Sequence, residues 1–262
     1  MVKKLYLVRH GETEGAQSNR YKGHIDVPLS GKGIRQMERL AKYIYQNPEH
    51  RACLPDRQAQ NTELKAVYTS DLSRAVKSAE IISEPYNIKP IIVRSLRERN
   101  FGIWEGMSFD EIKDKYPREF EAWVGNPLKF SPMKGESTLK VKDRALDALN
   151  KILNNHIRQN TDKSPPTPPH YLNHHSPSRG EGKGGGENLG SGLCNPGSES
   201  IAIVAHGGIN RIILCHLLGI PLENIFRIEQ DFSALNIVEF YDKYPVVKLI
   251  NCIIEDYVSD DF

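Results

Sequence analysis

Two histidines in this sequence each stand just after an apolar run and just before a glycine. His10 follows the run at residues 4–8, with Arg9 between, and His206 follows the run at 201–205. Ligand sites in α/β sheets form beyond the carboxyl ends of strands, and a glycine lets other groups come close. An imidazole there can act as a nucleophile, an acid or base, or an anion ligand. Either histidine alone could be a structural residue in a turn, but the repeated setting favours a functional site.

Two arginines lie where they could join these histidines. Arg9 directly precedes His10, and Arg74 falls in the first turn of a helix expected after the apolar run at 66–70. Arginine side chains and a helix N-terminus bind anions, most naturally phosphate. The sequence contains neither a GxxxxGKS/T motif nor a GxGxxG after a strand. A nucleotide site built on a glycine-rich loop is therefore not predicted.

Glu98 is the candidate acid for such a site. It follows a third short apolar run at 91–93 and lies between Arg97 and Arg99. A carboxylate between arginines is often only a solvated ion pair. Its place after a strand also makes Glu98 a candidate to carry a proton during catalysis.

These residues must be positioned by strands that alternate with helices. Hydrophobic patterning predicts strands at 4–8, 66–70, 91–93, 201–205, 235–240 and 246–250, and helices at 30–46, 72–84, 209–218 and from Ser137 onward. Several strands are uniformly apolar, which is typical of a mostly parallel sheet that is covered on both faces. We therefore expect an α/β fold with three layers, α/β/α, around a mostly parallel central sheet.

The composition narrows the class of protein. The chain has 262 residues, 39% of them hydrophobic, and 35 Lys and Arg against 33 Asp and Glu give a net charge of +2. This supports a hydrophobic core and argues against a protein that neutralises nucleic acid or anionic lipid. The sequence has no apolar run near the ~20 residues of a membrane helix, and the four apolar residues before Arg9 are too few for the apolar region of a secretory signal. We expect a cytoplasmic protein with no nucleic-acid or membrane partner.

No group of residues has the spacing of a metal site or of a disulfide framework. The cysteines lie far apart without a CxxC motif, at positions 53, 194, 215 and 252. The histidines at 170, 174 and 175 have no cysteine or carboxylate partner at ligand spacing. We predict no metal ligands.

Two segments depart from the α/β pattern. Residues 160–199 contain eight Gly, six Pro, five Ser and four Asn, so they cannot bury enough surface to offset the entropy of ordering. We expect a flexible surface insertion there, and a smaller one at 47–63. Such insertions are tolerated because the cost of closing a loop grows slowly with its length.

Four blocks of sequence occur in a distinctive order. They are RHGET at 9–13, SDLSRA at 70–75, LRE at 96–98 followed by FGIWEG at 101–106, and AHGG at 205–208. Together they resemble the signature blocks of the histidine phosphatase superfamily, in its phosphoglycerate-mutase-like branch. The resemblance extends over 1–262 except the two expected insertions, and it implies a single domain with the phosphoglycerate-mutase-like fold.

The resemblance implies a role for each candidate residue. His10 would attack phosphorus and carry the phosphoryl group as phosphohistidine, while its other ring nitrogen donates to a backbone carbonyl. Glu98 would protonate the leaving oxygen and then take a proton from water. Arg9, Arg74 and His206 would bind the phosphoryl oxygens and stabilise the transition state.

The resemblance also implies what surrounds this centre. Thr13, Lys22, Gly23 and Gly207 would contact the phosphate or the rest of the substrate, which would be a small phosphorylated metabolite. Because positive side chains do the electrostatic work, neither a metal nor another cofactor is implied. The oligomeric state is open between monomer and homodimer.

Within the family, the sequence favours a phosphatase over a mutase. Mutases carry an asparagine, a tyrosine and a lysine at three positions where this chain has Ala16, Phe101 and Phe109. The WEG at 104–106 and the GES at 135–137 look like the phosphatase side of the family. A member that binds partners without catalysis is the least favoured alternative, since every core residue is present.

Further motifs point to one substrate class. The GETE at 11–14, the YKGH at 21–24, the PL at 28–29, and the tail formed by FRIEQ at 226–230 and SALN at 233–236 resemble α-ribazole phosphatases of cobalamin biosynthesis. Similar pieces occur in broad-specificity and sugar-phosphate phosphatases, which remain alternatives. Phe101, Trp104 and Phe109 could line a pocket for a large organic leaving group or simply pack a lid over the sheet edge.

Overall fold

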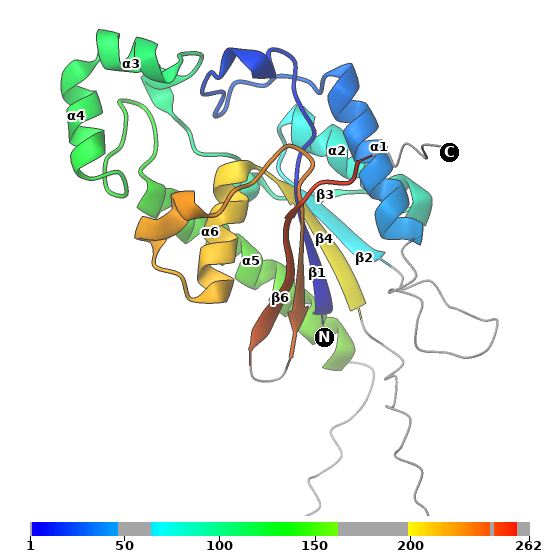
Figure 1. The fold of residues 1–262 in the computed structure, drawn as a ribbon. Helices are drawn as coiled ribbons and strands as arrows, with labels where there is room; N and C mark the ends of the chain where they lie inside the picture. The colour runs from blue at the N-terminus through cyan, green and yellow to red at the C-terminus, as the bar shows by residue number, and fades with distance from the viewer. Residues whose placement is uncertain (1, 47–63, 162–198, 242–243, 256–262) are drawn as a thin grey trace, which may run out of the picture.

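A six-stranded mixed sheet forms the centre of the protein (Figure 1). This computed structural model describes residues 2–46, 64–161, 199–241 and 244–255. The sheet order is β3-β2-β4-β1-β5-β6. The strands are β1 (Val2–Arg9), β2 (Leu64–Thr69), β3 (Ile91–Ile92), β4 (Glu199–Ala205), β5 (Leu235–Phe240) and β6 (Pro245–Cys252).

The pairing of β1 with β4 positions the two histidines. The strands run parallel, and Arg9 lies opposite Ala205 in their register. The backbone N–H of His10 then donates to the carbonyl oxygen of Ala205 at 3.0 Å. His10 and His206 therefore leave the same edge of the sheet side by side.

Helices cover both faces of the sheet, as the apolar strands predict (Figure 1). On one face α1 (Gly31–Gln46) and α2 (Ser73–Ser83) contribute to one apolar cluster. On the other, α5 (Thr138–Thr161) and α6 (Gly207–Leu218) contribute to a second. The expected α/β/α layers and mostly parallel sheet are confirmed, with β5 as the strand that runs antiparallel to its neighbours.

Two further helices were not predicted from the sequence. They are α3 (Phe109–Lys115) and α4 (Pro117–Gly125), which lie away from the sheet (Figure 1). They are short, and their apolar residues face one another and a pocket rather than the sheet, so no long helical stripe marks them. Among the described residues, the short 3-10 helices are Ala16–Ser18, Glu84–Tyr86, Arg94–Leu96, Gly102–Trp104 and Leu222–Arg227.

The two insertions expected from composition fall largely or wholly outside the described residues. The described chain stops at Gln46 and Thr161 and resumes at Leu64 and Glu199. Across the described ranges, no helix is both long enough and apolar enough to cross a membrane.

The first turn of α1 is pressed against the loop that carries His10. Ser30 N–H donates to the carbonyl oxygen of Glu12 at 2.9 Å, and Ser30 Oγ accepts from Gly33 N–H at 3.0 Å. A Cβ atom on Gly33 would lie 2.0 Å from the carbonyl oxygen of Glu12. Glycine at this position is thus what lets the helix approach the loop.

Replacing Gly33 with alanine should therefore destabilise the protein. We expect Gly33→Ala to lower the free energy of unfolding by about 1–3 kcal/mol, because the added methyl group forces the helix and loop apart. Gly31→Ala is the matched control on the same turn, since its Cβ would meet only the end of Arg35 at 3.7 Å. Urea unfolding of both variants checks this, and equal stabilities would contradict the close approach.

Candidate active site

His10 is buried at the carboxyl end of β1, with one ring nitrogen fixed by the backbone. Its side chain is 5% exposed. Nδ1 lies 2.8 Å from the carbonyl oxygen of Gly11, the contact expected from the sequence. A carbonyl only accepts, so this contact places the proton on Nδ1 and leaves the lone pair on Nε2. The neutral ring can therefore attack through Nε2.

The surroundings keep His10 neutral. Burial lowers its pKa well below the ordinary 6.5, and the positive charges of Arg9 and Arg74 lower it further. Burial likewise lowers the pKa of His206 well below 6.5, with His10 and both arginines adding to the shift. Protonation would add a third positive charge to a site that already holds two, so the uncharged rings are favoured.

His206 is fully buried beside His10 and is oriented by Ser70. The two imidazole rings are 5.1 Å apart, edge to face. Ser70 Oγ lies 2.8 Å from Nε2 of His206 and also accepts from the N–H of Leu72 at 3.4 Å. The Ser70 hydroxyl carries one O–H, which can donate to Nε2, and that donation puts the His206 proton on Nδ1. His206 then becomes a donor toward an anion.

Arg9 and Arg74 are buried cations held by backbone carbonyls. Arg74 donates to the carbonyl oxygens of Gly23 at 2.7 Å and Ile25 at 2.9 Å. Arg9 donates to the carbonyl oxygen of Gln230, and its guanidinium lies 4.1 Å from the ring centre of Phe232. Burial lowers the pKa of Arg9 to about 10, although the nearby Glu98 opposes the shift. Both arginines therefore remain charged near neutral pH.

Two buried nitrogen atoms of this centre lack a protein acceptor. Nε of Arg9 and Nδ1 of His206 have no hydrogen-bond partner among the described residues. A buried donor left unpaired costs about 1–3 kcal/mol. Oxygen atoms of a bound anion would satisfy both, so the arrangement fits phosphate.

The remaining predicted phosphate ligands lie on the loops around this centre. Lys22 Nζ donates to Thr13 Oγ1 at 2.5 Å, and Gly23 supplies a carbonyl to Arg74. Gly23 has φ +49°, and a Cβ there would collide with the Glu105 carboxylate. Gly207 begins α6 close to Arg9: a Cβ on it would lie 3.5 Å from the Arg9 guanidinium.

Glu98 borders the same pocket as the two histidines. Its Oε1 accepts from the N–H of Arg99 at 2.8 Å, and its Oε2 accepts from the N–H of Gly208 at 3.0 Å. A Cβ on Gly208 would lie 2.4 Å from Glu98 Oε1, so a larger residue there would push the carboxyl group out of this position. The carboxyl group is thus held beside the start of α6, next to His206.

The predicted site residues border one pocket of about 450 Å³. The predicted residues at its base are Arg9, His10, Thr13, Lys22, Gly23, Arg74, Glu98, His206 and Gly207. Its outer wall is aromatic and includes Phe101, Trp104, Phe109, Phe120 and Trp123. The pocket thus brings all nine of these residues together, along with others that the sequence did not single out, such as Arg211 and Phe232.

The aromatic residues were expected either to line a pocket for the leaving group or simply to pack together, and each expectation holds for a different residue. Trp104 is 3% exposed and stacks on Phe130 with ring centres 5.2 Å apart, so it mainly packs the wall. Phe109 is 45% exposed and meets Phe120 edge to face at 4.9 Å. Phe109 thus presents an apolar surface at the pocket.

Sequence reasoning missed several residues that complete the site. Ser70 was noted only as part of a motif, and Phe232, which packs on both His10 and Arg9, was not noted. Phe120 and Trp123 were missed because the short helix α4 was not predicted. Phe232 follows no motif or periodicity, so no local signal could have identified it.

The two neutral histidines should make the folded protein sensitive to mild acid. In the unfolded chain they titrate near 6.5, while in the folded protein their pKa lies well below that value. Between these pH values the unfolded chain binds more protons, so the free energy of unfolding falls as the pH falls, by about 1.4 kcal/mol per pH unit for each histidine.

Urea unfolding between pH 7.0 and 5.5 measures this slope. His10→Asn should lose a large part of it, whereas His216→Asn, which changes an exposed histidine of α6, should keep it. An unchanged slope in His10→Asn would show that His10 is not held neutral.

Comparison with known proteins identifies the family of this chain. It matches the histidine phosphatase superfamily (branch 1) over residues 5–161 and 193–253. Phosphoserine phosphatase 1 of Hydrogenobacter thermophilus is 25% identical over 95% of this chain and 92% of its own. An adenosylcobalamin/alpha-ribazole phosphatase of Salmonella typhimurium is 25% identical over 95% of this chain and 96% of its own.

A solved structure agrees with this placement. Bacillus stearothermophilus YhfR is similar to this chain with a TM-score of 0.69 and 26% identity, over 96% of this chain and 99% of that one. The resemblance expressed by the four sequence blocks is thereby confirmed. The chain belongs to branch 1 of the histidine phosphatase superfamily and is a phosphatase enzyme of that family.

Proposed function

We propose that this phosphatase hydrolyses small phosphomonoesters through a phosphohistidine on His10. The observation that carries the proposal is the hydrogen bond from Nδ1 of His10 to the Gly11 carbonyl, which leaves a neutral Nε2 at the base of a cationic pocket. An imidazole attacks through an unprotonated ring nitrogen, and the buried cations favour the neutral ring here.

In the first step, Nε2 of His10 attacks phosphorus in line. The N–P bond forms as the bond from phosphorus to the ester oxygen breaks, and Glu98 gives its proton to that oxygen. The alcohol leaves, and His10 carries the phosphoryl group. Arg9, Arg74 and Nδ1 of His206 donate to the phosphoryl oxygens as charge develops.

In the second step, water attacks the phosphohistidine. Glu98, now a carboxylate, takes a proton from the water as the new P–O bond forms and the N–P bond breaks. Inorganic phosphate leaves, and both His10 and Glu98 return to their starting states. Arg9, Arg74 and Lys22 supply the positive charge at the phosphate, and we propose that the reaction needs no metal.

For the substrate, we propose α-ribazole 5′-phosphate. The aromatic wall around Phe109 and Phe120 offers apolar faces to a flat organic leaving group. The Salmonella relative named for this substrate matches nearly the whole chain. A mutase is less favoured, because Ala16, Phe101 and Phe109 border the pocket where mutases carry polar residues.

O-phosphoserine is the second candidate substrate. It is supported by the Hydrogenobacter relative, which also matches nearly the whole chain. Broad-specificity or sugar-phosphate hydrolysis is the further alternative. A panel of substrates separates the three.

The test is initial phosphate release from α-ribazole 5′-phosphate, O-phosphoserine, 3-phosphoglycerate, a sugar phosphate and p-nitrophenyl phosphate. We expect kcat/KM for α-ribazole 5′-phosphate to exceed the others by a hundredfold, which is about 2.7 kcal/mol of selective transition-state binding. A preference for O-phosphoserine would replace the substrate assignment, and equal rates would indicate broad specificity.

Two controls accompany the panel. His10→Ala should lose activity toward every substrate, and activity that survives would contradict the phosphohistidine route. Excess chelator should leave the rates unchanged, whereas a loss restored by zinc or magnesium would refute the metal-free reaction.

A further inference from the structure

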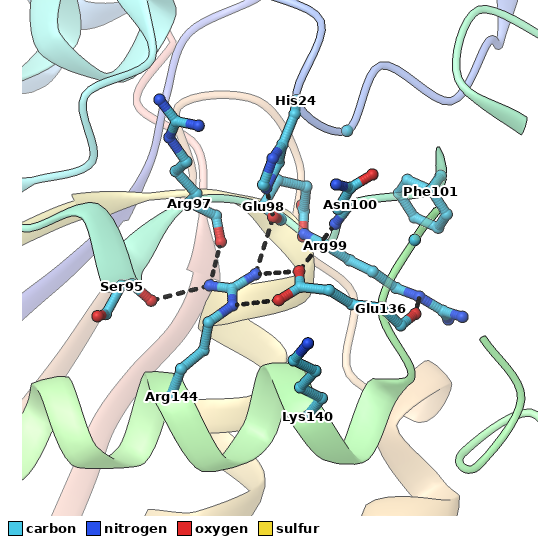
Figure 2. A network of polar contacts seen from close by, with 12 residues as sticks. His24, Ser95, Arg97, Glu98, Arg99, Asn100, Phe101, Glu136, Lys140 and Arg144 are labelled. Carbon is cyan, nitrogen blue, oxygen red and sulfur yellow. Dashed lines mark hydrogen bonds and ion pairs between the residues drawn. The ribbon is translucent and has the colours of Figure 1, made fainter. Parts of the chain in front are cut away.

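The segment that carries Glu98 is held from below by one arginine of α5 (Figure 2). Nη1 of Arg144 donates to the carbonyl oxygens of Ser95 at 2.8 Å and Arg97 at 2.6 Å. Its Nη2 donates to the carbonyl oxygen of Glu98 itself at 2.9 Å. One guanidinium therefore ties down three carbonyls of this short stretch.

Glu136 completes the arrangement from the other side. Its Oε1 accepts from Arg144 Nε at 3.0 Å, and its Oε2 accepts from Arg144 Nη2 at 2.8 Å. Oε2 also accepts from the N–H of Asn100 at 3.0 Å, and the Glu136 N–H donates to the Asn100 carbonyl at 2.8 Å. The backbone is thus held on both sides of Glu98.

The geometry uses the whole guanidinium. An arginine has five N–H donors in a planar fork. Here the five contacts go to three backbone carbonyls and to both oxygens of Glu136. The two side chains are only 20% and 14% exposed, so water competes weakly for these hydrogen bonds.

The charge on Glu136 fits this role. Burial alone would raise its pKa, but hydrogen bonds from Arg144 and the Asn100 N–H outweigh burial and lower it. Glu136 is therefore a carboxylate near neutral pH and can neutralise Arg144. This is a different task from that of Glu98, whose carboxyl oxygens meet the N–H groups of Arg99 and Gly208.

The Arg144–Glu136 pair differs from an ordinary surface ion pair because it also binds the backbone around Glu98. Three of the five contacts of Arg144 go to the backbone of Glu98 and its neighbours. The orientation of the Glu98 carboxyl in turn depends on where the Arg99 N–H lies. A displacement of about 1 Å at a catalytic group can cost a hundredfold in rate. Fixing this backbone therefore fixes the direction in which Glu98 presents its proton.

We propose that Arg144 and Glu136 act as positioning residues, forming a clamp that holds Glu98 in place to protonate the leaving oxygen. The inference rests on the proposed function, because it takes Glu98 as the proton donor. It assigns a task to the GES segment at 135–137, which the reaction itself leaves without one.

The test compares two substrates that differ in how much they need the proton. Phenyl phosphate and p-nitrophenyl phosphate are similar in size, but phenolate is the poorer leaving group. The ratio kcat/KM covers the steps up to departure of the alcohol, so it reports on Glu98 as the acid. A defect in positioning Glu98 should slow phenyl phosphate more than p-nitrophenyl phosphate.

We expect Arg144→Met to lower kcat/KM for phenyl phosphate at least tenfold more than for p-nitrophenyl phosphate. Glu98→Gln should show the same selectivity more strongly. Arg144→Lys should fall between, since one ammonium cannot reach all five acceptors. Inhibition by inorganic phosphate should change by less than twofold, because the phosphate ligands are untouched.

Lys140→Met is the matched control. Lys140 lies one turn earlier on α5, is exposed, and makes no contact in this network (Figure 2). The Lys140→Met substitution removes a positive charge from the same helix, and the variant should discriminate between the two substrates as the original protein does. An effect of Lys140→Met as large as that of Arg144→Met would overturn the clamp in favour of a general charge effect.

Three other results would also overturn the proposal. Equal losses on both substrates in Arg144→Met would show a general structural role, and no loss would show no role. Thermal unfolding shows whether Arg144→Met folds. If it does not fold, Arg144→Lys and Glu136→Gln are compared in its place, by the same difference in kcat/KM loss between the two substrates. If Glu98→Gln itself shows no selectivity, Glu98 is not the acid, and the proposed function fails together with the clamp.

Discussion

The parallel pairing of β1 with β4 is the constraint on which the site depends. The register that sets Arg9 opposite Ala205 delivers the next residue of each strand, His10 and His206, to one point. The strand pairing alone brings the two histidines together, because each follows a buried strand and both strands end at the same edge of the sheet. Any slip of the register by one residue would turn one side chain to the opposite face and separate the two imidazoles.

The same arrangement sets the electrostatics. Two arginines and two imidazoles are buried together, and both rings stay neutral because protonation would add charge to a site that already repels it. Orphaned nitrogens on Arg9 and His206 remain without protein acceptors among the described residues. Such a centre is unfavourable when empty and is satisfied by an anion with several oxygens. Phosphate binding would therefore offset the free-energy cost of leaving these two buried nitrogens unpaired.

Glu98, the proposed proton donor, comes from a different part of the fold. Glu98 lies on a stretch with little regular structure between β3 and the 3-10 helix Gly102–Trp104, so the sheet alone does not fix it. Arg144 of α5 and Glu136 supply the missing rigidity through backbone carbonyls and an N–H group (Figure 2). The sheet thus places His10, and a side-chain network places Glu98.

The sequence predicts the sheet-borne part of this picture well. Apolar runs mark the strands, and His10 and His206 stand at the ends of two of them, so position and chemistry coincide. The sequence predicts poorly the contacts and short helices that depend on packing between distant parts of the chain. Phe232 reaches His10 from a loop before β5 without any motif, α3 and α4 are too short to show a periodic stripe, and the contacts of Arg144 join residues 46 to 49 positions apart. The Arg144 carbonyl contacts could not be read from local spacing.

The measurement that tests the central claim most directly is rapid quenching of turnover with a phosphomonoester labelled in its phosphoryl group, followed by mapping of the protein-bound label. The account predicts a label that is stable to alkali and labile to acid, on Nε2 of His10, and that disappears as phosphate is released. A label on any other residue, or turnover without protein-bound label at any time, would contradict it.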